Sequence, residues 1–278
     1  MNLVDQLFEF HFMQNALLTG TVVSVLAGAV GYFVVLRGQS FAAHTLAQVG
    51  FPGAAAGVLV HTSPLAGLLA FCTASALAIA MAGRGLNVGR RSEAAVVGTI
   101  LAFSLGLGLL FFRLYAGSAQ GIYAFLFGTI LGISDGAVLT TVAMAGVCLA
   151  ALAVIARPLL FASIDPDVAA ARGVPVRALS VIFLVLVALA VAQAVQIVGT
   201  LLIFALLVAP AAAAQQLTAR PWLGLALSVL LSLLFTWAGL AVAYFTIYPV
   251  GFFITSLAFG AYLLIRVARR ASRLVQPA

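Results

Sequence analysis

Long apolar segments recur along almost the whole chain, and this pattern limits the possible folds more than any other feature. A stretch of about 20 apolar residues is long enough to cross the hydrocarbon core of a bilayer as a helix. Only 7% of the 278 residues are charged, so little of the chain suits a water-exposed domain. Nine apolar segments fall at residues 15–35, 42–60, 64–83, 94–112, 135–156, 178–194, 197–214, 222–245 and 249–265.

These segments predict an all-α, polytopic helical membrane protein, with eight to ten transmembrane helices and nine as the best count. The sixth and seventh segments are nearly continuous through Gln193, Gln196 and Gly199, which fits either two short helices or one helix plus a broken one. No room remains for a globular domain, so we expect a single transmembrane domain over residues 1–278.

The basic residues predict the orientation of the chain in a cell (inner) membrane. All 13 are arginine, and basic residues gather in cytoplasmic loops. With alternating spans and an outside N-terminus, only Arg113 falls outside, and the C-terminus is cytoplasmic. Residues 1–14 carry Asp5 and Glu9 but no basic residue, so we expect no cleaved signal peptide. The arginines form no basic cluster interleaved with aromatic residues on a soluble surface, so nucleic acid is not an expected partner.

The longest predicted cytoplasmic loop, residues 157–178, carries the signals of a short helix. Asp165 suits the N-cap, Pro166 the first helical position and Asp167 the positive end of the helix dipole. Arg172 suits the last turn, and Gly173 ends the helix before a further proline. A helix on the side where ATP is available indicates a docking element for a soluble partner. The plain alternative is a surface helix without a partner.

The second predicted span places two polar side chains on one helix face. His44 precedes Gln48 by four residues, so the two stand one turn apart. An ionisable side chain inside a span is costly and usually faces a cavity or a partner, and neutral imidazole is a common ligand for divalent ions. Pro52 and Gly53 are expected to loosen the helix and free backbone carbonyls. The plain alternative is that His44 only hydrogen-bonds a neighbouring helix.

Two further residues are candidates for a pathway entrance on the outer side. His61 falls in an outside-facing segment and Asp135 at the outer end of the fifth span, where Asp135 also suits an N-cap. No nucleophile, base and orienting group lie together, and the chain has no glycine-rich phosphate loop. We therefore expect a transport subunit and not an enzyme, with no catalytic residues and no covalently bound cofactor.

Four segments resemble the permeases of zinc and manganese ABC importers over nearly the full length of the chain. The arginine-to-proline stretch is similar to the family signature R-x-x-S…D-x-L-S/A-H…P-G, and the cytoplasmic loop to D-x-x-x-A-x-A-x-G-V. These segments are Arg37–Gly53, Leu126–Val138, Ile164–Val176 and Val195–Arg220.

The resemblance implies a type II ABC importer fold and several partners. Two permease subunits, as a homodimer or with a paralogue, form the pathway within the lipid, and a periplasmic or lipoprotein solute-binding protein delivers the metal. A cytoplasmic ATPase binds ATP and docks on the loop helix. Carried over by position, the coupling residues would be Asp165, Asp167, Ala169, Ala171 and Gly173.

One departure from the family pattern affects the expected cargo. The family usually offers an aspartate and, four residues on, a histidine that are implicated in ion binding, where this chain has His44 and Gln48. Loss of the carboxylate weakens attraction for a dication, and manganese depends on oxygen ligands more than zinc does. We therefore expect transported Zn²⁺ in preference to Mn²⁺.

Two other functions fit the same sequence. A permease of the iron-chelate or cobalamin type has a wide apolar pathway in which a lone histidine plays no part. A secondary metal carrier driven by protons would use His44 as its titrating group and would need no ATPase. A membrane enzyme fits less well, because few polar side chains lie at membrane depth.

Overall fold

The computed structural model describes residues 11–85, 90–114, 128, 130 and 132–275, and these form helices and connecting turns with no strand among them. Asp5, Glu9 and much of the segment 126–131 lie outside the described residues. The described helices, in chain order, are α2 (His11–Leu36), α3 (Ser40–Leu59), α4 (Pro64–Gly85), α5 (Arg90–Leu114), α7 (Asp135–Ile164), α8 (Pro166–Ala171), α9 (Val176–Leu217), α10 (Pro221–Tyr244) and α11 (Val250–Val275).

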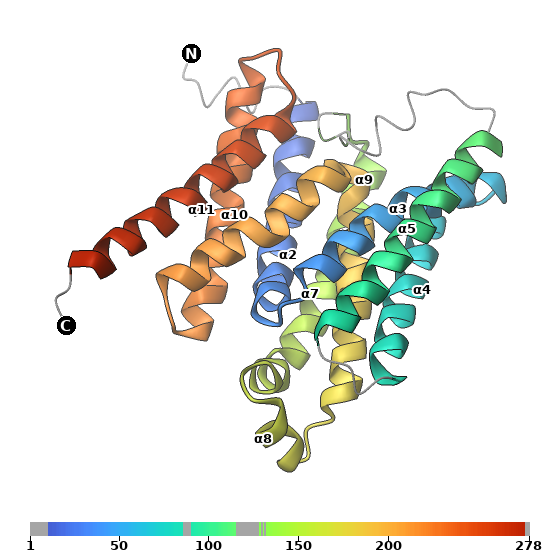
Figure 1. The fold of residues 1–278 in the computed structure, drawn as a ribbon. Coiled ribbons are helices and arrows are strands. Elements are labelled where there is room, and N and C mark those ends of the chain that lie inside the picture. The colour runs from blue at the N-terminus through green and yellow to red at the C-terminus, as the bar shows by residue number, and fades with distance from the viewer. Residues whose placement is uncertain (1–10, 86–89, 115–127, 129, 131, 276–278) are drawn as a thin grey trace.

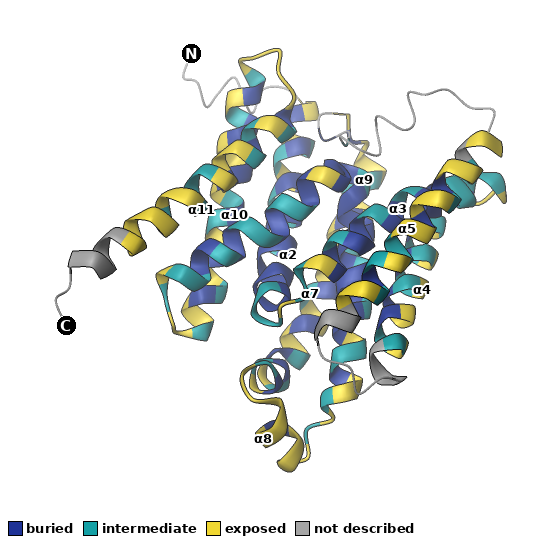
Figure 2. Ribbon diagram, viewed as in Figure 1, coloured by how far each residue is buried: buried dark blue, intermediate teal, exposed yellow. Residues whose placement is uncertain are grey.

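Helix α9 is the centre of the bundle. It contacts α2, α3, α4, α7, α10 and α11. Buried residues are concentrated on α2 and α9, whereas α8 is mostly exposed at one end of the bundle, beside the ends of α7 and α9 (Figures 1 and 2). The outward faces of the other helices carry exposed leucine, valine and phenylalanine side chains, as expected where lipid is the solvent.

A break divides α9 into two helices that run in different directions (Figure 1). Gly199 has φ 80° and ψ 164°, a conformation that a side chain would strain, so the helical hydrogen-bond ladder cannot pass through it. A Cβ atom at Gly128 would overlap the backbone of Val198, so the chain near Gly128 lies directly against this break. The sixth and seventh apolar segments are therefore two helices that meet at Gly199.

Seven of the described helices are long and apolar enough to cross a membrane. Helix α3 falls short because polar residues, among them His44 and Gln48, lower its hydropathy, and α9 is counted once despite its break. Adding α3 and separating the two halves of α9 recovers all of the predicted spans. The prediction of an all-α polytopic membrane fold is confirmed.

The backbones of α2 and α9 touch at Gly31, which allows a direct test of the packing. A Cβ atom there would overlap the backbone carbonyl of Leu207, and no flexible side chain is available to move away. Close approach at small residues is a main source of helix association in lipid. We expect Gly31→Ala to destabilise the protein by about 3 kcal/mol, the upper part of the usual range for overpacking, because two backbones must separate.

Thermal unfolding of the detergent-solubilised protein measures this effect, and Gly106→Ala is the matched control. Gly106 is also a helical glycine, but no described atom lies within 4 Å of a Cβ atom at that position. The control should leave the melting temperature unchanged or slightly raised, because alanine favours a helix over glycine. Equal melting temperatures for the two variants would contradict the described contact between α2 and α9.

Candidate functional site

His44 lies on α3 with its imidazole against α9. The side chain is half-buried, and its ring meets the Phe204 ring edge to face, with centroids 4.7 Å apart and an interplanar angle of 66°. The Nδ1 atom is shielded from solvent and has no hydrogen-bond partner among the described residues. The Nδ1 atom therefore makes no hydrogen bond that ties α3 to another described helix.

Gln48 adds two oxygen atoms one turn further along α3. Its side chain is half-buried on the same helix face as His44. Pro52 lies inside the helix and has no N–H, so the backbone carbonyl of Gln48 lacks its usual helical donor. The imidazole nitrogen, the side-chain amide oxygen and the freed carbonyl oxygen are all ligand types that divalent ions accept.

The break in α9 lies beside these groups. A Cβ atom built at Gly50 of α3 would lie 3.7 Å from the Cγ1 atom of Val195 in α9. The His44 ring contacts the Phe204 ring, also in α9. The two contacts fall on either side of Gly199, so the broken part of α9 faces the stretch of α3 that contains Gln48. Interrupted helices of this kind leave unpaired backbone groups and commonly line the binding sites of transporters.

Sequence reasoning missed two residues at this place, Phe204 and Thr200. Thr200 is fully buried, and its Oγ1 atom has no hydrogen-bond partner among the described residues. It lies one helical turn before Phe204 on the same face of α9. The only sequence signal was the near continuity of two apolar segments, which indicates a break without showing what faces it.

The described residues contain no group of three or more histidine, cysteine, aspartate or glutamate side chains placed to hold a metal ion. Cys72 and Cys148 are both buried and free, and neither joins such a group.

Helix α8 forms as the sequence predicts. The Asp165 side chain accepts a hydrogen bond from the Val168 N–H at 3.0 Å, and Pro166 is the first helical residue. Gly173 ends the helix with φ 80°, and its N–H bonds to the Ala170 carbonyl at 3.0 Å. Arg172 is the C-cap residue and thus lies just beyond the last turn in which we expected it.

The surface of α8 separates its residues into two groups. Ala169 is fully buried against the bundle, so its methyl group holds the helix in place. Asp165, Asp167, Ala171 and Gly173 are exposed. The exposed side is open to solvent, and the buried side packs against the ends of α7 and α9.

The two candidate entrance residues lie apart, and one expected role is wrong. Ser134, and not Asp135, is the N-cap of α7, where its hydroxyl accepts the Ala137 N–H. Asp135 follows in the first turn, accepts a hydrogen bond from Asn15 Nδ2 at 2.7 Å, and lies 3.8 Å from His11 Nε2. The negative charge of the Asp135 carboxylate therefore complements the positive N-terminal end of the α7 dipole, although Asp135 does not cap the helix.

His61 has a structural role of its own at the end of α3. It takes a left-handed conformation with φ 57°, and its N–H bonds to the Val58 carbonyl at 3.0 Å. The side chain is exposed, and no described contact joins it to Asp135. The structure thus brings Asp135 together with His11 and Asn15, and leaves His61 elsewhere on the surface.

Comparisons with known proteins identify the family of this chain. The model of the ABC 3 transport family matches residues 9–269. The manganese import system permease protein ScaB of Streptococcus parasanguinis is 32% identical over 241 residues, which cover 87% of this chain and 85% of that protein. The manganese transport system membrane protein MntC of Listeria innocua is 30% identical over 218 residues, or 78% of this chain and 76% of that protein.

A solved structure extends the likeness to three dimensions. PsaBC from Streptococcus pneumoniae in complex with Fab aligns with a TM-score of 0.84 at 29% identity, covering 95% of this chain and 94% of that chain. The two named relatives are a permease and a membrane protein of transport systems, and the family model spans nearly all of the sequence. The chain therefore belongs to the ABC 3 transport family and has the helical fold of its permeases.

Proposed function

We propose that this chain is the membrane-spanning permease subunit of an ABC importer for a divalent metal ion. The observation that carries the proposal is the partner-free Nδ1 atom of His44, which faces the broken helix α9 beside Gln48. Family membership supports the same function, since relatives with this fold are named for metal import. ATP would be bound and hydrolysed by a separate cytoplasmic ATPase, and a solute-binding protein would deliver the ion.

Manganese is the first ion to test. Both relatives are named for manganese, and neither name supports the preference for zinc that we expected from the sequence. The argument for zinc rests on the imidazole of His44 and the missing carboxylate. Two permease subunits around one pathway would supply two imidazoles and two amide side chains, which provides nitrogen and oxygen ligands for either ion.

The proposed orientation places the N-terminus outside and the C-terminus in the cytoplasm. Arginine asymmetry between the loops supports it, and it puts α8 on the side of the ATPase. The exposed residues of α8 would then form the docking surface, with Asp135 and His61 at the opposite, outer end of the bundle. The working unit would hold two permeases, identical or paralogous, in the cell membrane.

Uptake measurements in cells test this proposal. The chain is expressed with its ATPase and its solute-binding protein in a strain that lacks its own zinc and manganese importers. We expect accumulation of radiolabelled manganese, with or without zinc, and loss of accumulation when the ATPase carries an inactive catalytic site.

Three outcomes would contradict the proposal or part of it. Uptake that persists with the inactive ATPase would favour a proton-driven carrier. Uptake of an iron chelate or cobalamin in place of the free ions would favour the other permease type. Uptake of zinc without manganese would contradict the expectation that manganese is transported, which the names of the relatives suggest.

A further inference from the structure

Arg37 occupies a rigid turn between α2 and α3. The Gln39 N–H bonds to the Val34 carbonyl at 2.9 Å, and the Gly38 N–H bonds to the Val35 carbonyl at 3.0 Å. This is a Schellman turn, which ends α2 and satisfies its last carbonyls. Helix α3 begins directly afterwards at Ser40. A displacement of the Arg37 backbone is therefore passed to the first turn of α3, and His44 begins the next turn.

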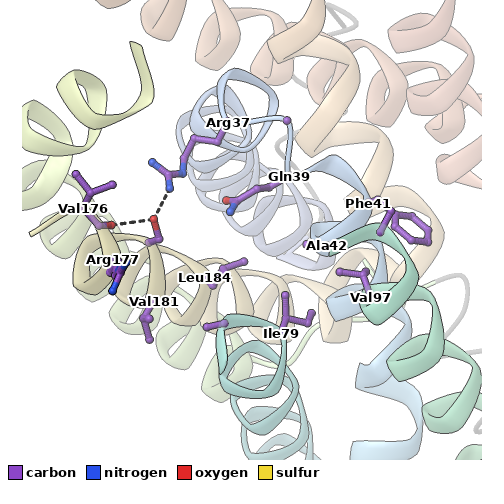
Figure 3. Close-up of a pocket in the computed structure, with 14 residues that line it drawn as sticks. Arg37, Gln39, Phe41, Ala42, Ile79, Val97, Val176, Arg177, Val181 and Leu184 are labelled. Carbon is purple, nitrogen blue, oxygen red and sulfur yellow. Dashed lines mark hydrogen bonds between the residues drawn. The ribbon is translucent and has the colours of Figure 1, made fainter. Parts of the chain in front are cut away.

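The Arg37 guanidinium reaches from this turn to the helices on both sides of α8. Its Nη2 donates to the Ser180 hydroxyl at 2.6 Å, at the start of α9, and its Nη1 donates to the Ser163 hydroxyl at 3.2 Å, at the end of α7. Figure 3 shows Arg37 extended toward α9. The guanidinium also lies over the buried Phe183 ring, 5.7 Å from its centroid.

Both hydroxyls are themselves fixed by backbone carbonyls. The Ser180 hydroxyl donates to the Val176 carbonyl at 2.9 Å, and the Ser163 hydroxyl donates to the Leu159 carbonyl. Each serine thus presents a lone pair to Arg37 and no competing donor. Because a guanidinium is planar with donors in a fixed fork, the two bonds set the spacing between the end of α7 and the start of α9.

A cavity of about 410 Å³ lies beside this bridge, between the α2–α3 turn and helices α4, α5 and α9. Arg37, Gln39 and Ser180 line it together with apolar side chains such as Ile79 and Val97 (Figure 3). Close-packed interiors resist displacement, and unfilled space permits it. The cavity borders the turn and the first residues of α3, so Arg37, Gln39 and Phe41 have unfilled space beside them.

We propose that Arg37 is a positioning residue that fastens both ends of the α8 segment to the start of α3. In this arrangement, a push on α8 moves the ends of α7 and α9, and Arg37 passes that movement to the helix that carries His44 and Gln48. The inference rests on the proposed function, because it takes α8 to be the place where the ATPase docks and the His44–Gln48 face to be the place where the ion binds. It adds a residue that lies outside both α8 and the His44–Gln48 face of α3.

The test uses the complete transporter, with ATPase and solute-binding protein, in proteoliposomes. Two quantities are measured for each variant: metal ions taken up per ATP hydrolysed, and the stimulation of ATP hydrolysis by metal-loaded binding protein. We expect Arg37→Lys to lower uptake per ATP by roughly tenfold while the complex still assembles, because a lysine keeps the charge but cannot hold both hydroxyls. Ser180→Ala should give a smaller loss, and Ser163→Ala, with the longer bond, the smallest.

Two controls separate this role from a general loss of stability. Ser232→Ala removes another buried hydroxyl, one with no hydrogen-bond partner among the described residues, and should leave both quantities unchanged. The double variant Arg37→Lys with Ser180→Ala should be no worse than Arg37→Lys alone, because residues in one hydrogen-bonded unit are not additive.

Wild-type uptake per ATP in both Arg37→Lys and Ser180→Ala would overturn the inference. Loss of ATPase binding in both variants would also overturn it, since Arg37 would then support assembly and not transmission. If the wild-type chain imports neither ion, the proposed function fails by itself. Stimulation of ATP hydrolysis by the binding protein still reports on Arg37 in that case, so the two failures are distinguishable.

Discussion

Replacing Gly173 with proline should abolish ATP-driven uptake and leave the membrane bundle folded. Gly173 has φ 80°, whereas proline is confined to about −65°, and proline also removes the N–H that bonds to the Ala170 carbonyl. The C-terminal end of α8 would therefore unwind. The residue is exposed at the end of the bundle, so the spans should be unaffected. Uptake, thermal unfolding and co-purification of the ATPase measure the three consequences.

Gly173→Ala is the matched control for this variant. No described atom lies within 4 Å of a Cβ atom at this position, so alanine adds only the strain of a left-handed conformation, about 1–2 kcal/mol. It should retain part of the uptake and bind the ATPase more weakly. Normal uptake by Gly173→Pro would show that the shape of α8 is irrelevant to coupling, and the segment would be a plain surface helix.

Local rules were enough to predict α8 from the sequence. The N-cap Asp165, the following Pro166 and the terminal Gly173 each act within a few residues of their own position. Asp135 shows the limit of such rules, because Ser134 beside it is an equally good cap and takes that role in the structure. Which of two adjacent caps is used depends on where the helix axis is held by its neighbours.

The polar residues of α3 explain why the candidate site was harder to predict than the spans. His44 and Gln48 lower the hydropathy of α3 below that of the other spans, so the features that suggest a site also weaken the signal for the helix that carries it. Their partners come from α9, more than 140 residues later in the chain. Contacts such as His44 with Phe204 depend on tertiary packing, which no local pattern encodes.

Arg37, in the turn just before α3, illustrates the same limit. From the sequence, it contributed only to the count of cytoplasmic arginines and to the signature shared with the family. Its bonds to Ser163 and Ser180 join positions 126 and 143 residues apart. A count of charges predicts the side of the membrane on which an arginine lies, and only the packed helices show what it holds.

His44→Phe should lower metal uptake at limiting metal by at least about tenfold, since it removes a direct ligand and even outer-shell changes cost 10–100-fold in metal affinity. Phenylalanine keeps an aromatic ring against Phe204, so packing between α3 and α9 is largely preserved. His44→Ala should show the same loss of uptake together with a lower melting temperature. Comparison of the two variants separates the ligand role of the imidazole from its packing role.

A double variant tests whether this position also sets the choice of ion. His44→Asp with Gln48→His restores the aspartate and histidine that the family usually has at these positions. A carboxylate adds charge and a hard oxygen ligand, so uptake of manganese relative to zinc should rise several-fold. Uptake is measured with both ions present in one assay, and ATPase stimulation confirms that the variant is assembled. Wild-type uptake by His44→Phe, or an unchanged ion ratio in the double variant, would remove the ion from this part of α3 and leave the histidine as a packing residue against Phe204.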